Sequence, residues 1–113
     1  METGAIDAAA IMEVQKKYPA LTQFGFGGDG PIRTREVGLC VQWLLMHDGL
    51  DRRKTINEKI SSYTLKHVIE NAYETYIANG EVICAALYLK YKMRVRGPNA
   101  VFNIRELRPH HKI

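Results

Sequence analysis

The chain has 113 residues, of which 46% are hydrophobic and 25% charged, with a formal net charge of +4. This composition excludes an intrinsically disordered chain, and the length predicts one domain spanning residues 1–113. No apolar run approaches the roughly 20 residues of a membrane span, and the acidic N-terminus lacks the basic start of a signal peptide, so we expect a cytoplasmic protein without membrane contact.

A first helix is predicted to run to about Tyr18. Thr3 is a suitable N-cap residue, and Pro19 cannot continue a helix. Apolar residues recur at helical spacing within this stretch, which indicates that one face is buried. These residues are Ile6, Ala9, Ala10 and Val14.

Residues 20–33 are rich in glycine and have no hydrophobic periodicity, so we expect a loop that Phe24 and Phe26 anchor to the core. The pattern G-x-G-x-x-G begins at Gly25 and matches the fingerprint of dinucleotide-binding proteins. That fingerprint requires a strand before it and a helix that opens from its last glycine. Here a predicted helix precedes it and a proline follows it, so nucleotide binding is not expected.

A second helix is predicted over Thr34 to His47, with Thr34 as its cap and Gly49 just beyond its end. Its apolar residues cover more than one face. Such a helix either lies at the centre of the domain or supplies a surface for a homodimer or another partner. The apolar residues are Val37, Leu39, Cys40, Val41, Trp43, Leu44, Leu45 and Met46.

The charged segment from Asp48 to Lys59 is expected to be exposed. Its basic cluster consists of Arg52, Arg53 and Lys54. Three adjacent basic residues are either simply solvated or in contact with a partner, and both interpretations stay open.

A third helix is predicted to begin at Ser61 or Ser62, because both are good caps. Lys66 and Glu70 are four residues apart and are expected to form a surface ion pair, with His67 at the surface rather than acting as a base. Lys66 and His67 are also candidates for contact with a partner. The buried face is predicted to contain Leu65, Val68, Ile69, Ala72 and Tyr76.

A fourth helix is predicted to start at Asn79 as its cap. Residues 82–89 are apolar on every side, so neighbouring elements must enclose this helix. The third and fourth helices match a helix-turn-helix in outline, but such an apolar second helix suits a core better than a DNA groove.

Hydrophobic and basic residues alternate after Leu89. This predicts a strand up to residue 96, a turn at 97–99 and a return strand from Ala100 to Ile104. A helix that continues to Met93 is the alternative. Residues 105–113 are predicted to form a basic tail.

Positive charge is concentrated in this part of the chain, because residues 90–113 hold seven basic residues and one acidic residue. Such a surface favours an anionic partner, either a nucleic acid or an acidic region of a protein. The alternative is that the basic residues only protect an exposed sheet edge. The candidate contact residues are Lys90, Lys92, Arg94, Arg96, Arg105 and Arg108.

Little in the sequence indicates catalysis. Cys40 and Cys84 fall within apolar helical patterns, where a thiol is buried, reduced and inert. No cysteine or histidine spacing typical of a metal site occurs, and no pair of carboxylates is singled out. We therefore expect no enzymatic activity, cofactor or metal.

The stretch from Ile56 to Ile104 resembles a pattern found in small proteins of bacteria and their mobile elements. In outline the pattern is SSY-x-LKH-x-x-E, then Y-[IV]-x-NG-x-x-I-x-AA, then GPNA-x-FN, and it covers a little under half of the chain. The resemblance implies a short phage- or plasmid-borne protein, which is either a DNA-binding regulator or a stoichiometric inhibitor of host defence such as an anti-CRISPR protein. Its polar positions here are functional or structural; they are Lys66, His67, Glu70, Asn79 and Asn99.

The sequence therefore predicts a mainly α-helical (α+β) domain of four helices with a small C-terminal β-hairpin. We expect it to act without catalysis, by inhibiting a larger host complex through a basic surface. The alternative is a DNA-binding regulator, either helix-turn-helix-like or a β-ribbon, which would be dimeric through the helix at 34–47.

Overall fold

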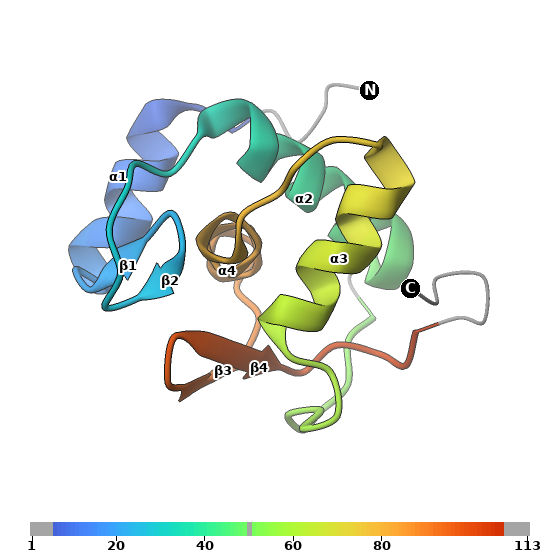
Figure 1. Ribbon diagram of the computed structural model, residues 1–113. Coiled ribbons are helices and arrows are strands. Elements are labelled where there is room, and N and C mark those ends of the chain that lie inside the picture. The colour runs from blue at the N-terminus through green and yellow to red at the C-terminus, as the bar shows by residue number, and fades with distance from the viewer. Residues whose placement is uncertain (1–5, 50, 108–113) are drawn as a thin grey trace.

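The structure is a computed structural model that describes residues 6–49 and 51–107 (Figure 1). Within these ranges the chain forms four helices and two antiparallel hairpins, which confirms the predicted α+β class with a C-terminal hairpin. None of the helices in these ranges has the length and hydrophobicity needed to cross a membrane. In chain order the elements are α1 (Ala8–Lys17), β1 (Leu21–Thr22), β2 (Gly25–Phe26), α2 (Thr34–Asp48), α3 (Ser62–Tyr73), α4 (Asn79–Tyr88), β3 (Met93–Arg96) and β4 (Asn99–Phe102).

Helix α4 lies at the centre of the molecule. Figure 1 shows it end-on, with the other three helices and the β3–β4 hairpin around it. Every residue from 79 to 87 is buried, which confirms that neighbours enclose this helix. The prediction that Asn79 is the cap was wrong, because Ala78 takes the extended N-cap conformation and Asn79 is the first helical residue.

The apolar surplus of α2 is explained by its packing against two helices, α4 and α3. Val37, Cys40, Val41 and Leu44 face the core, and Trp43 is also buried. Of the apolar residues predicted in this helix, Met46 is the one that stays largely exposed. Helix α2 therefore packs directly on the central helix α4, and Gly49 ends it as predicted, whereas Arg33 and not Thr34 takes the N-cap position.

Helix α3 begins after Ser61, whose side chain accepts a hydrogen bond from the Thr64 backbone N–H. Its predicted buried face is correct in the first two turns and wrong beyond them. The helix ends at Tyr73 because Glu74 adopts a left-handed conformation with φ 52°. Tyr76 therefore lies outside the helix and is 49% exposed.

Helix α1 starts later than predicted. Asp7 caps it by accepting a hydrogen bond from the Ala10 N–H, whereas Thr3 lies outside the described residues. This start places Ile11 and Val14 on the buried face and leaves Ala9 exposed.

The prediction of an irregular loop over residues 20–33 was wrong at its start, where β1 and β2 form a short hairpin. Phe26 packs against the core as expected, whereas Phe24 is 48% exposed and is not among the residues that pack against it. Gly80 lets the first turn of α4 approach this hairpin, since a Cβ there would lie 1.7 Å from the Thr22 carbonyl oxygen. The Gly80 N–H instead donates to the Gln23 carbonyl at 2.8 Å.

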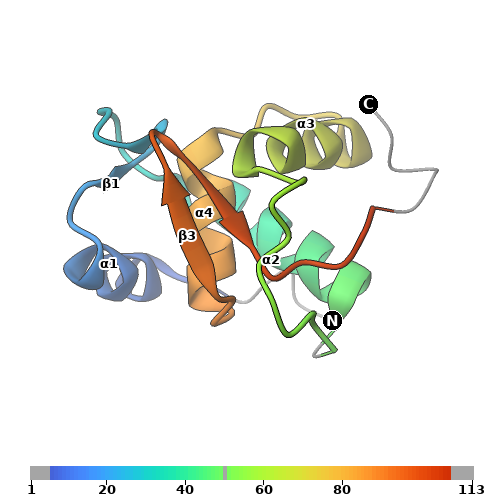
Figure 2. The same cartoon turned by 90° about the horizontal axis from the view of Figure 1, so that it is seen from below.

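The C-terminal hairpin settles the choice between strand and helix after Leu89. Helix α4 ends at Tyr88, and Lys90 then takes φ 69°, which turns the chain toward β3. Strand β3 begins at Met93, later than predicted, and Asn99 belongs to β4, so the turn is limited to Gly97 and Pro98. Figure 2 shows this hairpin from below, with β3 on its outer side.

Candidate functional site

Six basic residues belong to three separate segments of the chain whose side chains contact one another's segments. Figure 2 views the molecule from the side on which the β3–β4 hairpin lies. The segments are the stretch at 51–59, strand β3 with the residue before it, and the chain that leaves β4. Contacts join them: the Lys92 Nζ donates to the Lys54 carbonyl at 2.8 Å, for example. We call this surface the basic face; it comprises Arg53, Lys54, Lys92, Arg94, Arg96 and Arg105.

Two buried asparagines hold the basic face together. The Asn103 side chain accepts a hydrogen bond from the Lys92 N–H and donates one to the Arg53 carbonyl, both at 2.8 Å. The Asn57 side chain donates to the Ile104 carbonyl at 3.1 Å. Because both amides bind main-chain groups, the backbone that carries the basic side chains is fixed while their charged ends remain at the surface.

The arginines of the basic face have acidic neighbours within the chain. Arg94 and Arg96 both bind the Glu58 carboxylate. Elsewhere on the face, Arg105 lies 2.7 Å from Asp51, and Arg53 lies 3.5 Å from Glu106. Six basic and three acidic side chains leave a positive surface, but one less positive than the sequence suggests. Exposed pairs of this kind contribute at most about 1 kcal/mol each, so a partner's carboxylates can replace the internal ones.

The buried carboxylate of Asp48 supports the basic face through two hydrogen bonds. The Tyr91 hydroxyl donates to one Asp48 oxygen at 2.7 Å, and the Arg105 N–H donates to the other at 3.3 Å. Burial and, as a smaller effect, the hydrogen bond to Asp48 raise the pKa of Tyr91, so this phenol stays protonated. Arg52 stacks over the Tyr91 ring at 4.0 Å from its centroid. This predicted contact residue is thus half-buried and belongs to the support of the face.

The other predicted contact residues do not join the basic face. Lys90 lies in the turn after α4, beside α1, and not on the strand as predicted. Lys66 bonds to Glu70 at 3.0 Å, and the two side chains are 10% and 19% exposed, so the expected surface pair is mostly buried. His67 lies 3.2 Å from the same carboxylate and is one-third exposed. Arg108 lies outside the described residues.

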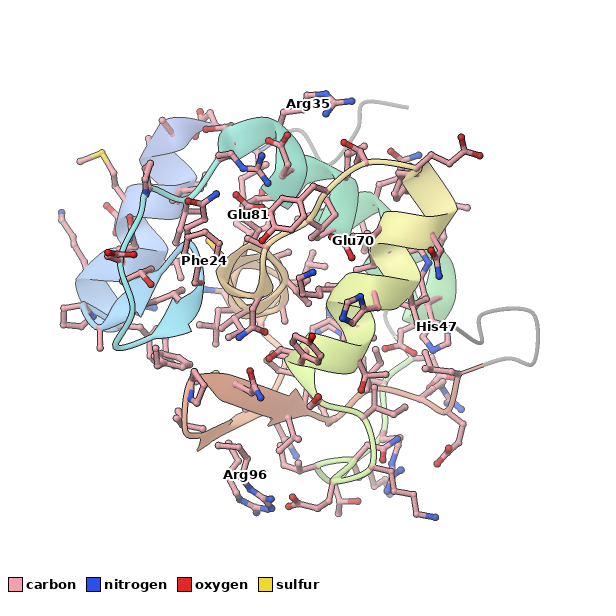
Figure 3. The ribbon with its side chains drawn as sticks, viewed as in Figure 1. Phe24, Arg35, His47, Glu70, Glu81 and Arg96 are labelled. Atoms are coloured by element: carbon pink, nitrogen blue, oxygen red, sulfur yellow. The ribbon has the colours of Figure 1, made fainter. Side chains whose placement is uncertain are left out.

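A second polar cluster, at the start of α4, was not found by sequence reasoning. The Glu81 side chain, labelled in Figure 3, is fully buried. It forms a bidentate pair with Arg33, at 2.8 and 2.9 Å. It also accepts the backbone N–H groups of Arg33 and Ala78, at 3.0 and 2.9 Å. The hydrogen bond to Glu81 raises the pKa of Arg33. All four donors are thereby satisfied, which is how a buried carboxylate becomes tolerable.

Tyr76 joins this cluster to α3. Its exposed ring lies between two cations, 5.4 Å from the Arg33 guanidinium carbon and 4.9 Å from the Lys66 Nζ. The Glu70 carboxylate accepts the Ile77 N–H at 3.1 Å as well as the Lys66 ammonium. The cluster therefore fixes the connection between α3 and α4, and every charged group in it has a partner within the chain.

A half-open groove of about 560 Å³ separates α1 from the end of α4. Its floor is apolar and aromatic, and Lys17 and Lys90 stand at its rim with Glu13. Helices α1 and α4 both end here, so their carbonyl ends offset the two ammonium charges. The groove thus has no strong charge preference, and it does not continue the basic face.

The two thiols are poor nucleophiles. Burial raises the pKa of Cys40 well above its ordinary value and that of Cys84 to about 12. Neither thiol has a histidine among the contacts of the described residues. Within residues 6–49 and 51–107, no group of three metal-ligating side chains comes together.

Comparisons with models of protein families, with curated proteins and with solved structures each found no match to this chain. The resemblance to proteins of mobile elements therefore stays a prediction from the residues alone. The basic face, which gathers four of the predicted contact arginines and two of the lysines, is the surface on which a function can be argued.

Proposed function

We propose that this chain acts without catalysis, as a stoichiometric inhibitor that presses its basic face against an acidic region of a larger host complex. The observation that carries the proposal is that contacts bring basic residues from three separate segments together. The resemblance to small proteins of mobile elements supports the inhibitor class. Positive surfaces of this kind speed association with acidic partners and set the orientation of the complex.

The pairing with Glu58 supports a protein partner. Arg94 and Arg96 share one carboxylate, although each side chain is still about half exposed, at 55% and 52%. Glu58 is itself 42% exposed, so it can swing away without a buried charge being left behind. Arginine forks match carboxylates in geometry, and a partner's aspartate or glutamate would occupy the place that Glu58 holds.

A second candidate is a β-ribbon regulator that binds DNA. Arg94 and Arg96 project from the same face of a two-stranded ribbon, an arrangement that suits contact with phosphates. The helix-turn-helix form of this hypothesis does not fit, because α4 is buried along its length and presents no side chains to a groove. The proposed dimer surface on α2 also packs mostly within the chain.

Affinity capture from a bacterial host lysate tests the proposal. We expect wild type to retain a stoichiometric protein partner and Arg94→Glu/Arg96→Glu to lose it. The matched control is Lys16→Glu/Arg35→Glu, which makes the same charge change on exposed positions of α1 and α2. The proposal fails if no partner is recovered, or if the two double variants behave alike while their thermal melts show that both are folded.

Two further measurements separate the candidates. Gel shifts with duplex and single-stranded DNA at about 50 mM salt should show no binding if the target is a protein, and binding that weakens steeply with salt if it is DNA. Glu58→Gln frees both arginines, so it should tighten binding to an acidic partner by about threefold to tenfold. An unchanged or weaker affinity would mean that these guanidinium groups do not contact the partner.

A further inference from the structure

Strand β3 has an open edge. The cross-strand partners are Arg96 with Asn99 beside the two-residue turn and Val95 with Ala100 next to them. In such a ladder, pairs that exchange hydrogen bonds alternate with pairs that do not. Lys92 lies opposite Asn103 in the continuation of this register, and the Asn103 N–H donates to the Lys92 carbonyl. Lys92 with Asn103 is thus a hydrogen-bonded pair, and by alternation so are Arg94 with Val101 and Arg96 with Asn99. The backbone N–H and C=O groups of Met93 and Val95 therefore point away from β4.

The two edges of the hairpin differ. On β4, the Ala100 N–H donates to the Ser62 hydroxyl at 3.0 Å, and the Phe102 carbonyl accepts the Asn57 N–H at 2.7 Å. On β3, no backbone group of Met93 or Val95 has a partner outside the hairpin among residues 6–49 and 51–107. The residues from Arg94 to Arg96 are also exposed to solvent. Figure 2 shows the same contrast, with the chain at 57–62 beside β4 and β3 on the side of the hairpin away from that chain.

We infer that this open edge receives an extended acidic segment of the partner as an added strand. The inference rests on the proposed function and names the partner's binding segment. Main-chain hydrogen bonds to Met93 and Val95 supply affinity without regard to sequence. Side chains of the added strand that lie on the Arg94 and Arg96 side meet positive charge, and those on the other side meet Val95, which is 47% exposed. The segment that fits alternates acidic and apolar residues over at least four positions.

Two other occupants fit the edge less well. A second copy of β3 in antiparallel pairing would set the arginines of one copy against those of the other, and like charges opposite each other are destabilising. A nucleic-acid backbone offers acceptors to the outward N–H groups, but its phosphates have no donors for the outward carbonyls. An extended peptide satisfies both kinds of group, and its carboxylates also satisfy the guanidinium charges.

The decisive variant is Val95→Pro. Proline removes the outward N–H, which the hairpin does not use, and edge strands tolerate proline at such a position. Val95→Ala is the matched control, since it shortens the side chain and keeps the N–H. The probe is the blocked peptide Glu-Val-Glu-Val-Glu-Val, with Glu-Glu-Glu-Val-Val-Val as a ligand of equal composition and charge without the alternation.

We expect wild type and Val95→Ala to bind the alternating peptide within about threefold of each other, and Val95→Pro to bind it about tenfold more weakly or worse. The peptide should also slow hydrogen exchange at the Met93 and Val95 amides of wild type, a measurement that holds even if the proline variant fails to fold. Equal binding of the two peptides, unprotected amides or an unaffected Val95→Pro each overturn strand addition. If Arg94→Glu/Arg96→Glu abolishes peptide binding while Val95→Pro leaves it unchanged, the basic face binds the acidic peptide but the peptide does not add as a strand.

Discussion

Replacing Arg33 by methionine should destabilise the fold, because it removes the guanidinium partner of the buried Glu81 carboxylate. The Glu81 carboxylate accepts four hydrogen bonds, and Arg33→Met removes the two guanidinium bonds while the two backbone N–H donors remain. A hydrogen bond to a charged group contributes about 1.5–3 kcal/mol, and breaking a buried pair costs about 3–5 kcal/mol. Because the Arg33 side chain is 36% exposed, water can reach part of the vacated site, so we expect a loss of about 3 kcal/mol.

Urea unfolding measures this loss as a lower midpoint with an unchanged m-value. Arg35→Met is the control, because Arg35 is 70% exposed and only touches Glu36 at 3.5 Å; its change should stay below about 0.5 kcal/mol. Glu81→Gln should also destabilise the fold, because its amide NH2 group would face two of the four N–H donors that the carboxylate oxygens accept. If Arg33→Met and Arg35→Met unfold within about 1 kcal/mol of each other, the Arg33–Glu81 pair does not stabilise the α4 entry as argued.

Three further measurements check other parts of the fold. Burial of Glu70 opposes ionisation, but its hydrogen bonds outweigh burial and lower its pKa below the ordinary 4.5. The stability that the ionised carboxylate adds is therefore present above pH 4.5 and is lost as the pH falls through the lowered pKa. Glu70→Gln should reduce this loss of stability at acidic pH, as measured by thermal melts at several pH values. Lys90→Gly should stabilise the protein by about 0.5–1 kcal/mol, since Lys90 has φ 69°, and Gly49→Ala, at φ 60°, should destabilise it by about as much. The thiols of Cys40 and Cys84 should react with an alkylating agent at neutral pH only in denaturant, and fast labelling of the native protein would contradict their burial.

Features set by neighbouring residues were the ones that could be predicted from the sequence. The cap at Ser61, the end of α2 at Gly49 and the enclosure of α4 each depend on a few adjacent positions or on one helical pattern. Helix and cap signals are local in this sense, because the hydrogen bonds involved join residues three or four apart. The alternation after Leu89 likewise indicated the hairpin, and the pairing shifted its limits by a few residues.

The missed features depend on residues far apart in the chain. Glu81 in the first turn of a helix has the pattern of a surface residue, and its burial follows from Arg33, 48 positions earlier. Glu58 meets Arg96 across 38 positions, so the partial neutralisation of the basic face has no local signal. Excess charge along the sequence indicated that basic residues would gather near the C-terminal hairpin, but it could not show which charges are already paired.

The polar residues of the mobile-element pattern make contacts within this chain. The Asn79 side chain donates to the Asn99 side-chain oxygen at 2.8 Å and so joins the start of α4 to the β3–β4 turn. Lys66 and His67 both contact Glu70, whose carboxylate accepts the Ile77 N–H just before α4 begins. Each of these residues fixes the position of α4, and none of them belongs to the basic face. The contacts that position α4 are thus made by residues other than the arginines of the basic face.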